Sequence, residues 1–221
     1  MLTAVKQRSS VATLLSLDII ITFAAAATIL CWVPGPDNLF VLMQSAIYGP
    51  VVGLCVTIGL CVGLVFHTVA VSLGVAAIFQ TSQLAFDALK FVGAAYLVYL
   101  AYKSFRARPD RLDEGTTKVK PMWQMVLRGV VMNVTNPKVA IFFLAFLPQF
   151  TSPASGSIVL QMLELGGIFI LCALASFSVI SLLAGSISKW LRRSDKSQVI
   201  LNRIAGFVFV GLALKLATAH R

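Results

Sequence analysis

The residues best suited to chemistry lie in two short polar stretches that interrupt long apolar runs. The first stretch reads VPGPDNLF and places Asp37 and Asn38 directly after Pro34, Gly35 and Pro36. Prolines remove backbone donors and end a helix, whereas aspartate and asparagine favour helix starts as capping residues. We therefore expect a helix to stop and restart here. A carboxylate at such a break can hold an ammonium group or exchange a proton.

The second stretch reads NVTNPKVAIFF and also falls within a long apolar run. Asn133 and Asn136 flank the interruption, Pro137 suits the first turn of a new helix, and Lys138 follows. A helix start carries free N–H groups and a partial positive charge, which attract carboxylates. Two opposed helix starts would thus form a polar pocket for a small anionic or zwitterionic group. We expect Asp37 and Lys138 to face each other or to share a cavity.

Simpler structural roles exist for each of these residues. A proline in an apolar helix often produces only a kink, and Asp37 and Lys138 could form a purely structural ion pair. His67 lies midway along the next apolar run. It could relay protons near neutral pH, and a hydrogen-bonded packing histidine is an equal alternative. The occurrence of two breaks in matching places favours a functional site over simple kinks.

The composition indicates that these stretches lie in a membrane. Of 221 residues, 58% are hydrophobic and only 12% are charged, with a mean hydropathy of +0.90. Soluble domains contain about 25% charged residues, so this chain belongs in a lipid bilayer. The net charge of +10 is concentrated in residues 106–120 and 188–198. Both segments lie between apolar runs, which is typical of cytoplasmic loops and argues against nucleic acid as a partner.

Six apolar segments are long enough to span a bilayer, and we expect all of them to be helices. They cover residues 19–47, 51–79, 84–105, 121–147, 157–187 and 199–219, with interruptions at 34–38 and 133–138. The predicted fold is all-α: a polytopic membrane protein with six transmembrane helices in two inverted three-helix repeats, whose first and fourth helices are broken. Residues 1–18 form an N-terminal tail, 19–105 the first repeat, 106–120 a basic cytoplasmic loop and 121–221 the second repeat.

The inverted repeat follows from the number of spans in each half. An odd number of spans per half inserts the second half upside down, as in many transporters, with the binding site between the repeats. The basic segments 106–120 and 188–198 then share the cytoplasmic side, and both termini lie outside. A five-span arrangement with the amino end inside is the alternative.

Four longer stretches are similar to those of a known family. PGPDNLFVLMQSAIYG, GLCVGLVFHTVAVSLGVAAI, LKFVGAAYLVYLAYKSFR and NPKVAIFFLAFLPQF resemble the amino-acid exporter family named for the lysine exporter and the homoserine/threonine resistance proteins (LysE/RhtB). The resemblance covers about residues 19–219. It implies a multi-pass protein of the bacterial inner membrane that exports amino acids or closely related metabolites, driven by the proton gradient.

The resemblance also implies which residues serve transport. The family's Pro-Gly-Pro element falls on Pro34–Pro36 and is followed by Asp37 and Asn38. Its Asn-Pro-Lys element falls on Asn136–Lys138, and its second-helix histidine falls on His67.

Other functional classes receive less support from the residues. We expect no enzymatic activity and no cofactor, and the partners would be an amino acid, protons and lipid, while a homo-oligomer is compatible with the sequence. A metal or small-ion transporter of similar fold is one alternative, although no cluster of metal ligands is evident. A membrane thiol oxidoreductase is another, because Cys31 lies near the first break. The second break has no matching cysteine near Met132, and thiol exchange needs a second sulfur.

Overall fold

The computed structural model describes residues 15–81, 83–107, 121–193 and 195–218, and these residues form helices, short helical turns and their connections. The all-α prediction is therefore confirmed. Residues 1–14 of the predicted tail and 108–120 of the predicted basic loop lie outside the described residues.

The described part of the chain contains eight α-helices. They are α1 (Leu17–Trp32), α2 (Pro36–Tyr48), α3 (Pro50–Thr81), α4 (Gln83–Arg106), α5 (Met122–Val134), α6 (Pro137–Ile141), α7 (Ile158–Arg193) and α8 (Asp195–Ala217). The axes of α1 and α2 differ by 60°, and those of α5 and the segment Pro137–Phe150 by 50°. Both predicted helix breaks are thus present.

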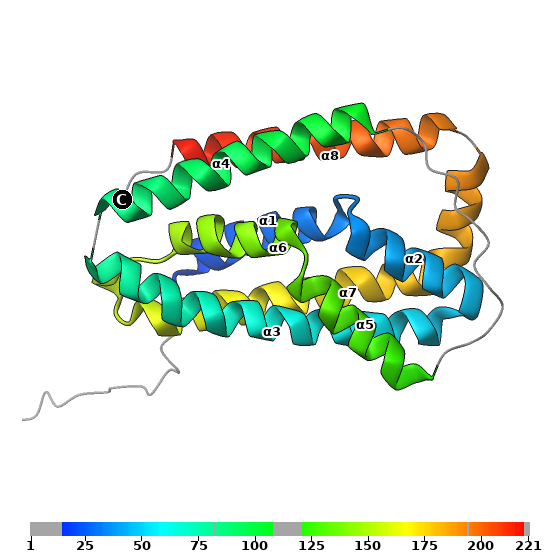
Figure 1. Ribbon diagram of the computed structural model, residues 1–221, viewed down its shortest axis with the longest axis horizontal. Helices are drawn as coiled ribbons and strands as arrows, with labels where there is room; N and C mark the ends of the chain where they lie inside the picture. Colours follow the sequence, from blue (N-terminus) through cyan, green and yellow to red (C-terminus); the bar gives the residue numbers. More distant parts are fainter. Residues whose placement is uncertain (1–14, 82, 108–120, 194, 219–221) are drawn as a thin grey trace, which may run out of the picture.

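The two bent pairs run in opposite directions along the molecule. In Figure 1, α1 leads through α2 toward the end that holds the turn into α3, whereas α5 starts at that end and leads through α6 away from it. The end of α4, the start of α5, the end of α7 and the start of α8 also lie at this end, while the start of α1 and the end of α8 lie at the other. The described residues on either side of the two predicted basic segments therefore lie at one end of the molecule, which is compatible with the predicted topology.

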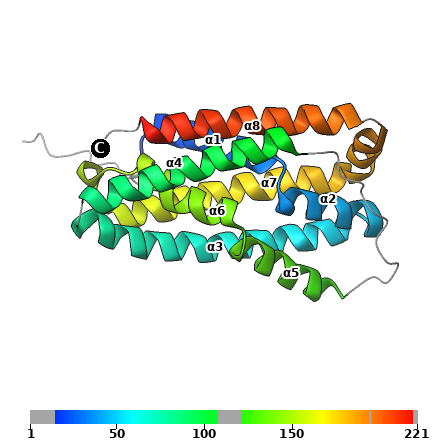
Figure 2. The ribbon, with the colours of Figure 1, turned by 45° about the horizontal axis from the view of Figure 1, so that its top comes forward.

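The number of membrane spans remains a prediction. Among the described residues, three helices are long and apolar enough to cross a bilayer alone, and up to five spans result if each bent pair counts as one. Helix α4 is not among these candidate spans. It contains four charged residues, Asp87, Lys90, Lys103 and Arg106. It nevertheless lies beside α8 in both ribbon views (Figures 1 and 2). The six-span arrangement and the inverted repeat are compatible with this course of the chain.

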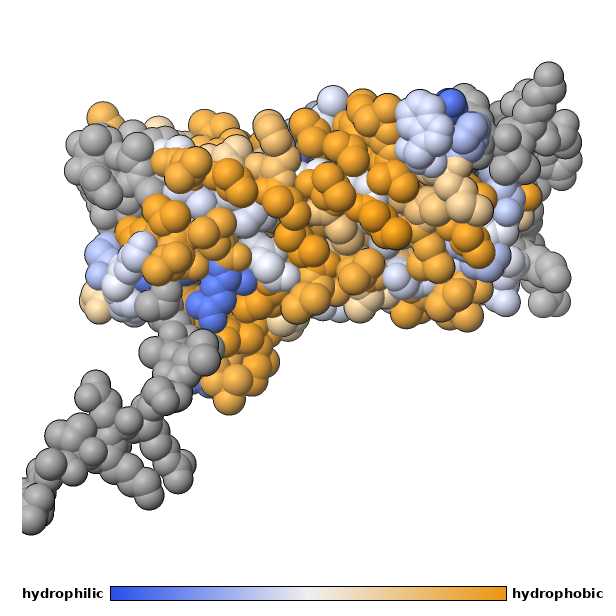
Figure 3. All heavy atoms as spheres, turned by 90° about the horizontal axis from the view of Figure 1, so that it is seen from below, coloured by the Kyte–Doolittle hydropathy of each residue, from blue (hydrophilic) through white to orange (hydrophobic). Residues whose placement is uncertain are grey.

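The outer surface is suited to lipid. Large apolar side chains are exposed on several helices, such as Phe66 (60%), Leu171 (67%) and Phe207 (69%). Figure 3 shows hydrophobic side chains over most of the central part of one long face, with hydrophilic ones mainly near its ends. Exposed apolar area on this scale is not found on soluble monomers, so the exposed band is expected to contact acyl chains.

Glycines allow α3 and α5 to cross closely. A Cβ on Gly129 would lie 3.0 Å from the Cα of Gly59 and from the backbone nitrogen of Leu60, and a Cβ on Gly63 would lie 2.6 Å from the Cβ of Asn133. Small residues at such crossings let membrane helices pack backbone to backbone. This crossing brings the C-terminal end of α5, and with it the second break, against the middle of α3.

Beyond the second break the chain departs from the continuous helix predicted from there to residue 147. Only Pro137–Ile141 is α-helical; Phe142–Phe146 forms a π-helical turn and Leu147–Phe150 a 3₁₀ turn. The rings of Phe142 and Phe146 lie 4.7 Å apart, and Phe23 of α1 and Phe169 of α7 join them. The widened turn accompanies the packing of these bulky rings, and Pro148 is compatible with the tighter turn that follows.

Candidate functional site

The first break follows from the two prolines around Gly35. Val33 (φ −64°, ψ 123°) and Gly35 (φ −158°, ψ 176°) are both extended, as residues before proline usually are. Helix α1 therefore ends at Trp32, and Pro36 begins α2 with a φ that suits the first helical turn. One expectation is wrong in detail: Gly35 is the N-cap of α2, and Asp37 and Asn38 lie within the first turn and make no capping hydrogen bond.

The second break is capped as expected from the sequence. The side-chain Oδ1 of Asn136 accepts a hydrogen bond of 3.0 Å from the backbone N–H of Lys138, and Pro137 occupies the first turn of α6. Asn133 lies at the end of α5 and is buried. The short α6 thus starts with Lys138 fixed in its first turn.

The two breaks meet in a buried ion pair. The Nζ of Lys138 lies 3.3 Å from Oδ1 of Asp37, and these side chains are only 6% and 4% exposed. The prediction that the two residues face each other is therefore confirmed. Gly35 packs against this pair, because a Cβ at that position would lie 2.8 Å from Oδ1 of Asp37 and 2.9 Å from Nζ of Lys138.

Polar side chains bind backbone carbonyl groups beside the two breaks. Nδ2 of Asn38 donates to the carbonyl oxygen of Cys31, and Nζ of Lys138 donates to that of Val33 at 3.4 Å. His67 Nε2 lies 3.2 Å from the carbonyl oxygen of Asn133. A carbonyl only accepts hydrogen bonds, so Nε2 carries the proton in this contact. A helix break at membrane depth requires such partners, since lipid offers none.

Several polar atoms at the breaks have no hydrogen-bond partner in the described part of the chain. They are Oδ1 of Asn38, Oδ1 of Asn133 and Nδ2 of Asn136, and all three residues are buried. Oδ1 of Asp37 also accepts no hydrogen bond there, but it has the ion pair with Lys138. Buried polar groups without partners are unfavourable. A polar ligand or water that forms a hydrogen bond with one of these atoms therefore lowers the free energy of the site.

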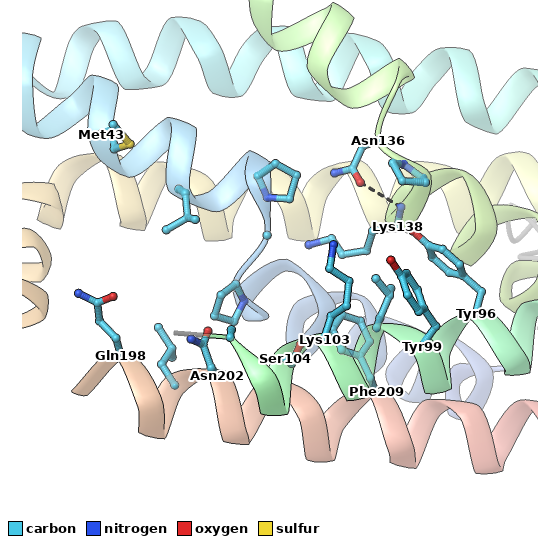
Figure 4. A pocket seen from close by; sticks show the side chains of 18 residues that line it. Met43, Tyr96, Tyr99, Lys103, Ser104, Asn136, Lys138, Gln198, Asn202 and Phe209 are labelled. Atoms are coloured by element: carbon cyan, nitrogen blue, oxygen red, sulfur yellow. Dashed lines mark hydrogen bonds between the residues drawn. The ribbon is translucent and has the colours of Figure 1, made fainter. Parts of the chain in front are cut away.

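A cavity of about 880 Å³ opens between the breaks and the helix pair α4 and α8 (Figure 4). The breaks contribute Pro34, Gly35, Pro36, Asn136, Pro137 and Lys138 to its wall. Asp37, Asn38, Asn133 and His67 do not line it. Of the predicted site residues, then, six face the cavity, while the other four lie behind the wall and hold it in place through the contacts above.

The sequence prediction missed the opposite wall of the cavity. It consists mainly of residues from α4 and α8, among them Tyr96, Tyr99, Lys103, Ser104 and Asn202. The residues contributed by α4 recur at intervals of three and four, the spacing of one helix face. Polar and aromatic residues at that spacing in an apolar segment are a signal that could have identified this wall.

A second, smaller cavity of about 630 Å³ lies on the other side of the breaks. Pro36, Asn136 and Pro137 line both cavities, and Arg128 and Thr135 line this one only.

Within the described residues, no group of three or more histidine, cysteine or acidic side chains is placed to hold a metal ion. Cys31 and the other three cysteines are free thiols.

Almost the whole chain is similar in sequence to known membrane proteins and to one family model. The family model described as LysE type translocator matches residues 28–220. The uncharacterized membrane protein YrhP of Bacillus subtilis (strain 168) is 30% identical over 205 residues, which cover 89% of this chain and 97% of the relative. No solved structure matches the chain significantly.

Relatives named for a transported compound also match. The leucine efflux protein of Enterobacter sp. (strain 638) is 28% identical over 202 residues, covering 90% of this chain and 95% of the relative. The leucine efflux protein of Salmonella choleraesuis (strain SC-B67) is 29% identical over 201 residues, covering 89% and 93%.

Proposed function

The chain belongs to the LysE type translocator family, and on that basis we propose that it is a secondary exporter that moves amino acids or closely related metabolites out of the cytoplasm in exchange for protons. The family, the leucine efflux relatives, the apolar surface and the membrane-length helices support an amino-acid exporter in the bacterial inner membrane. The proton coupling and the roles of individual residues are the proposal.

The observation that carries the proposal is the buried ion pair between Asp37 and Lys138 beside the cavity. The charged ends of an amino acid are a carboxylate and an ammonium group, the same two groups that this pair already contains. A zwitterion can therefore replace one internal ion pair with two new ones. No net charge has to enter the low-dielectric interior, which keeps the desolvation penalty small.

The geometry suggests an order for this exchange. Lys138 lines the cavity and Asp37 does not, so the ammonium group of Lys138 meets an incoming substrate first. The substrate carboxylate binds to Nζ of Lys138, with the unpartnered Nδ2 of Asn136 close by as a further donor. When Lys138 turns toward the substrate, Asp37 loses its partner and accepts the substrate's ammonium group.

Proton coupling follows from competition at Asp37. A protonated Asp37 cannot hold an ammonium group, so a proton arriving from outside releases the substrate, and loss of that proton to the cytoplasm prepares the site again. Proton and substrate then occupy the site alternately, which is the condition for antiport. One proton enters for each zwitterion that leaves, so both the pH gradient and the membrane potential drive export.

Two measurements test the proposal. The first is metabolite profiling of the medium of cells that express the chain, with vector-only cells as the control. The second is flux of the identified compound from proteoliposomes with and without an imposed pH gradient. We expect an amine-bearing metabolite to accumulate outside cells, and its flux to be accelerated by the gradient. The proposal is contradicted if the cells export no amino acid, or if the flux is the same with and without the pH gradient.

A further inference from the structure

The cavity wall divides into a charged region and an apolar region. Leu39 and Met43 of α2, Leu100 of α4 and Leu201 and Phe209 of α8 supply a broad apolar surface. An aliphatic or aromatic side chain placed against this surface leaves water, which favours its binding. The two charged side chains lie elsewhere on the wall, Lys138 at the second break and Lys103 near the end of α4, while Gln198 and Asn202 of α8 add uncharged amides.

The charge of the cavity is positive. Lys138 and Lys103 are the charged side chains among the described residues that line it, and no carboxylate of the described residues does so. Figure 4 shows both lysines pointing into the cavity from opposite walls, Lys138 from the second break and Lys103 from α4. Lys138 is balanced by Asp37 at 3.3 Å, so Lys103 provides the excess charge.

Lys103 lies between the C-terminal end of α4 and the ion pair. It is exposed in the last turn of α4, and its Nζ lies 5.7 Å from the ring centroid of Tyr99, which also lines the cavity. Any substrate that enters from this end passes this ammonium group before it reaches Lys138. A second positive charge on the substrate is repelled there, because like charges repel more strongly in a partly hydrated site than in bulk water.

We propose that Lys103 selects substrates by charge: the cavity accepts amino acids with uncharged, apolar side chains and rejects lysine and arginine. The inference rests on the proposed export function and specifies its substrate class. The α-carboxylate binds at Lys138 and Asn136, the side chain lies along the apolar wall, and a terminal ammonium or guanidinium group is left beside Lys103 without a partner.

Norleucine and lysine are the matched ligands for the test, because lysine is norleucine with an ammonium group at its end. The purified full chain is titrated with each, and the affinity is taken from the rise in thermal stability. We expect norleucine to bind about tenfold or more tightly than lysine, a ratio typical of a like-charge contact in a partly hydrated site. Lys103→Glu should raise the affinity for lysine relative to norleucine by about tenfold or more, and Lys103→Gln should have an intermediate effect.

Lys215→Gln is the matched control. Lys215 is also exposed and also contacts an aromatic ring, with its Nζ 4.7 Å from the ring centroid of Phe150, but it does not line the cavity. Its replacement should leave the norleucine-to-lysine ratio as it is in the unaltered chain.

The outcomes separate the two proposals. Equal binding of lysine and norleucine by the unaltered chain, or an unchanged ratio in Lys103→Glu, overturns the selection by Lys103 and leaves the export function standing. Failure of both ligands and of a panel of other amino acids to bind, together with absent export, overturns the proposed function and this inference with it.

Discussion

Lys138 and Asp37 come from opposite halves of the chain, and their charged groups lie 3.3 Å apart in the interior of the helix bundle. Each residue directly follows a proline that breaks a helix. Their contact therefore joins the two breaks, and it is the only place among the described residues where buried side chains of opposite charge from the two halves meet.

The ion pair predicts a specific pattern in a double-mutant cycle. Asp37→Asn or Lys138→Gln leaves one charge buried without its partner, so each should lower the free energy of unfolding by about 3–5 kcal/mol. The double variant should recover most of this loss because no unpaired charge remains. Export should be absent in all three variants.

Thermal unfolding of the purified variants, together with flux measurements, checks this prediction. Membrane insertion of each variant is the control. Single variants as stable as the original chain would show that water already solvates these charged groups. Active export by the double variant would show that neither residue is required for transport.

Gly35 predicts a steric effect on the same pair. In Gly35→Ala the new methyl group would lie 2.8–2.9 Å from the charged atoms of Asp37 and Lys138 and would push them apart. We expect a stability loss of about 1–3 kcal/mol, as for other overpacked interior sites, and at least a tenfold lower flux. Gly167→Ala in α7 is the control, since a Cβ there meets nothing within 4 Å. Equal flux in both variants would disprove the steric role of Gly35.

His67 should act by holding the second break in place. Its Nε2 hydrogen bond to Asn133 is 3.2 Å long, and it does not line the large cavity. His67→Leu should destabilise the fold by about 1 kcal/mol and slow export, whereas the amide of His67→Gln can still donate and should preserve flux with the original pH profile. A pH profile that shifts in His67→Gln would instead assign proton relay to this histidine.

The crossing of α3 and α5 predicts a limit on side-chain size at Gly129. A larger residue there collides with the backbone at Gly59 and Leu60, so Gly129→Val should lower stability by about 1–3 kcal/mol or more. Gly185→Val, where a Cβ meets nothing within 4 Å, is the control. The yield of folded protein after detergent extraction gives the comparison, and equal yields would contradict the close crossing.

Ser104 tests both the orientation and the cavity. In a background with the four native cysteines replaced by alanine, Ser104→Cys should resist an impermeant thiol reagent added to intact cells and react in inside-out vesicles. Excess substrate should protect it, because Ser104 lines the cavity. Labelling from outside would reverse the predicted topology. Export by the cysteine-free background would also exclude the thiol oxidoreductase alternative.

The sequence by itself determined the class of the protein and the existence of the breaks. Composition and segment length required a membrane, because so much apolar surface cannot be buried in a soluble domain of this size. Pro34, Pro36 and Pro137 interrupt helices through local sterics, which act whatever the rest of the chain does. The opposite charges of Asp37 and Lys138 also made their pairing predictable, since an unpaired charge at this depth is unfavourable.

Only the tertiary structure decided which residues face the cavity. The rotation of α4 and α8 about their axes places Tyr96, Lys103 and Asn202 on the inner wall, and this rotation depends on how neighbouring helices pack. Likewise, Asp37 lies behind Lys138 because of contacts between the two distant breaks, which no local pattern specifies. The steric effect of a proline depends only on neighbouring residues, whereas the direction of a side chain depends on the packing of the whole bundle.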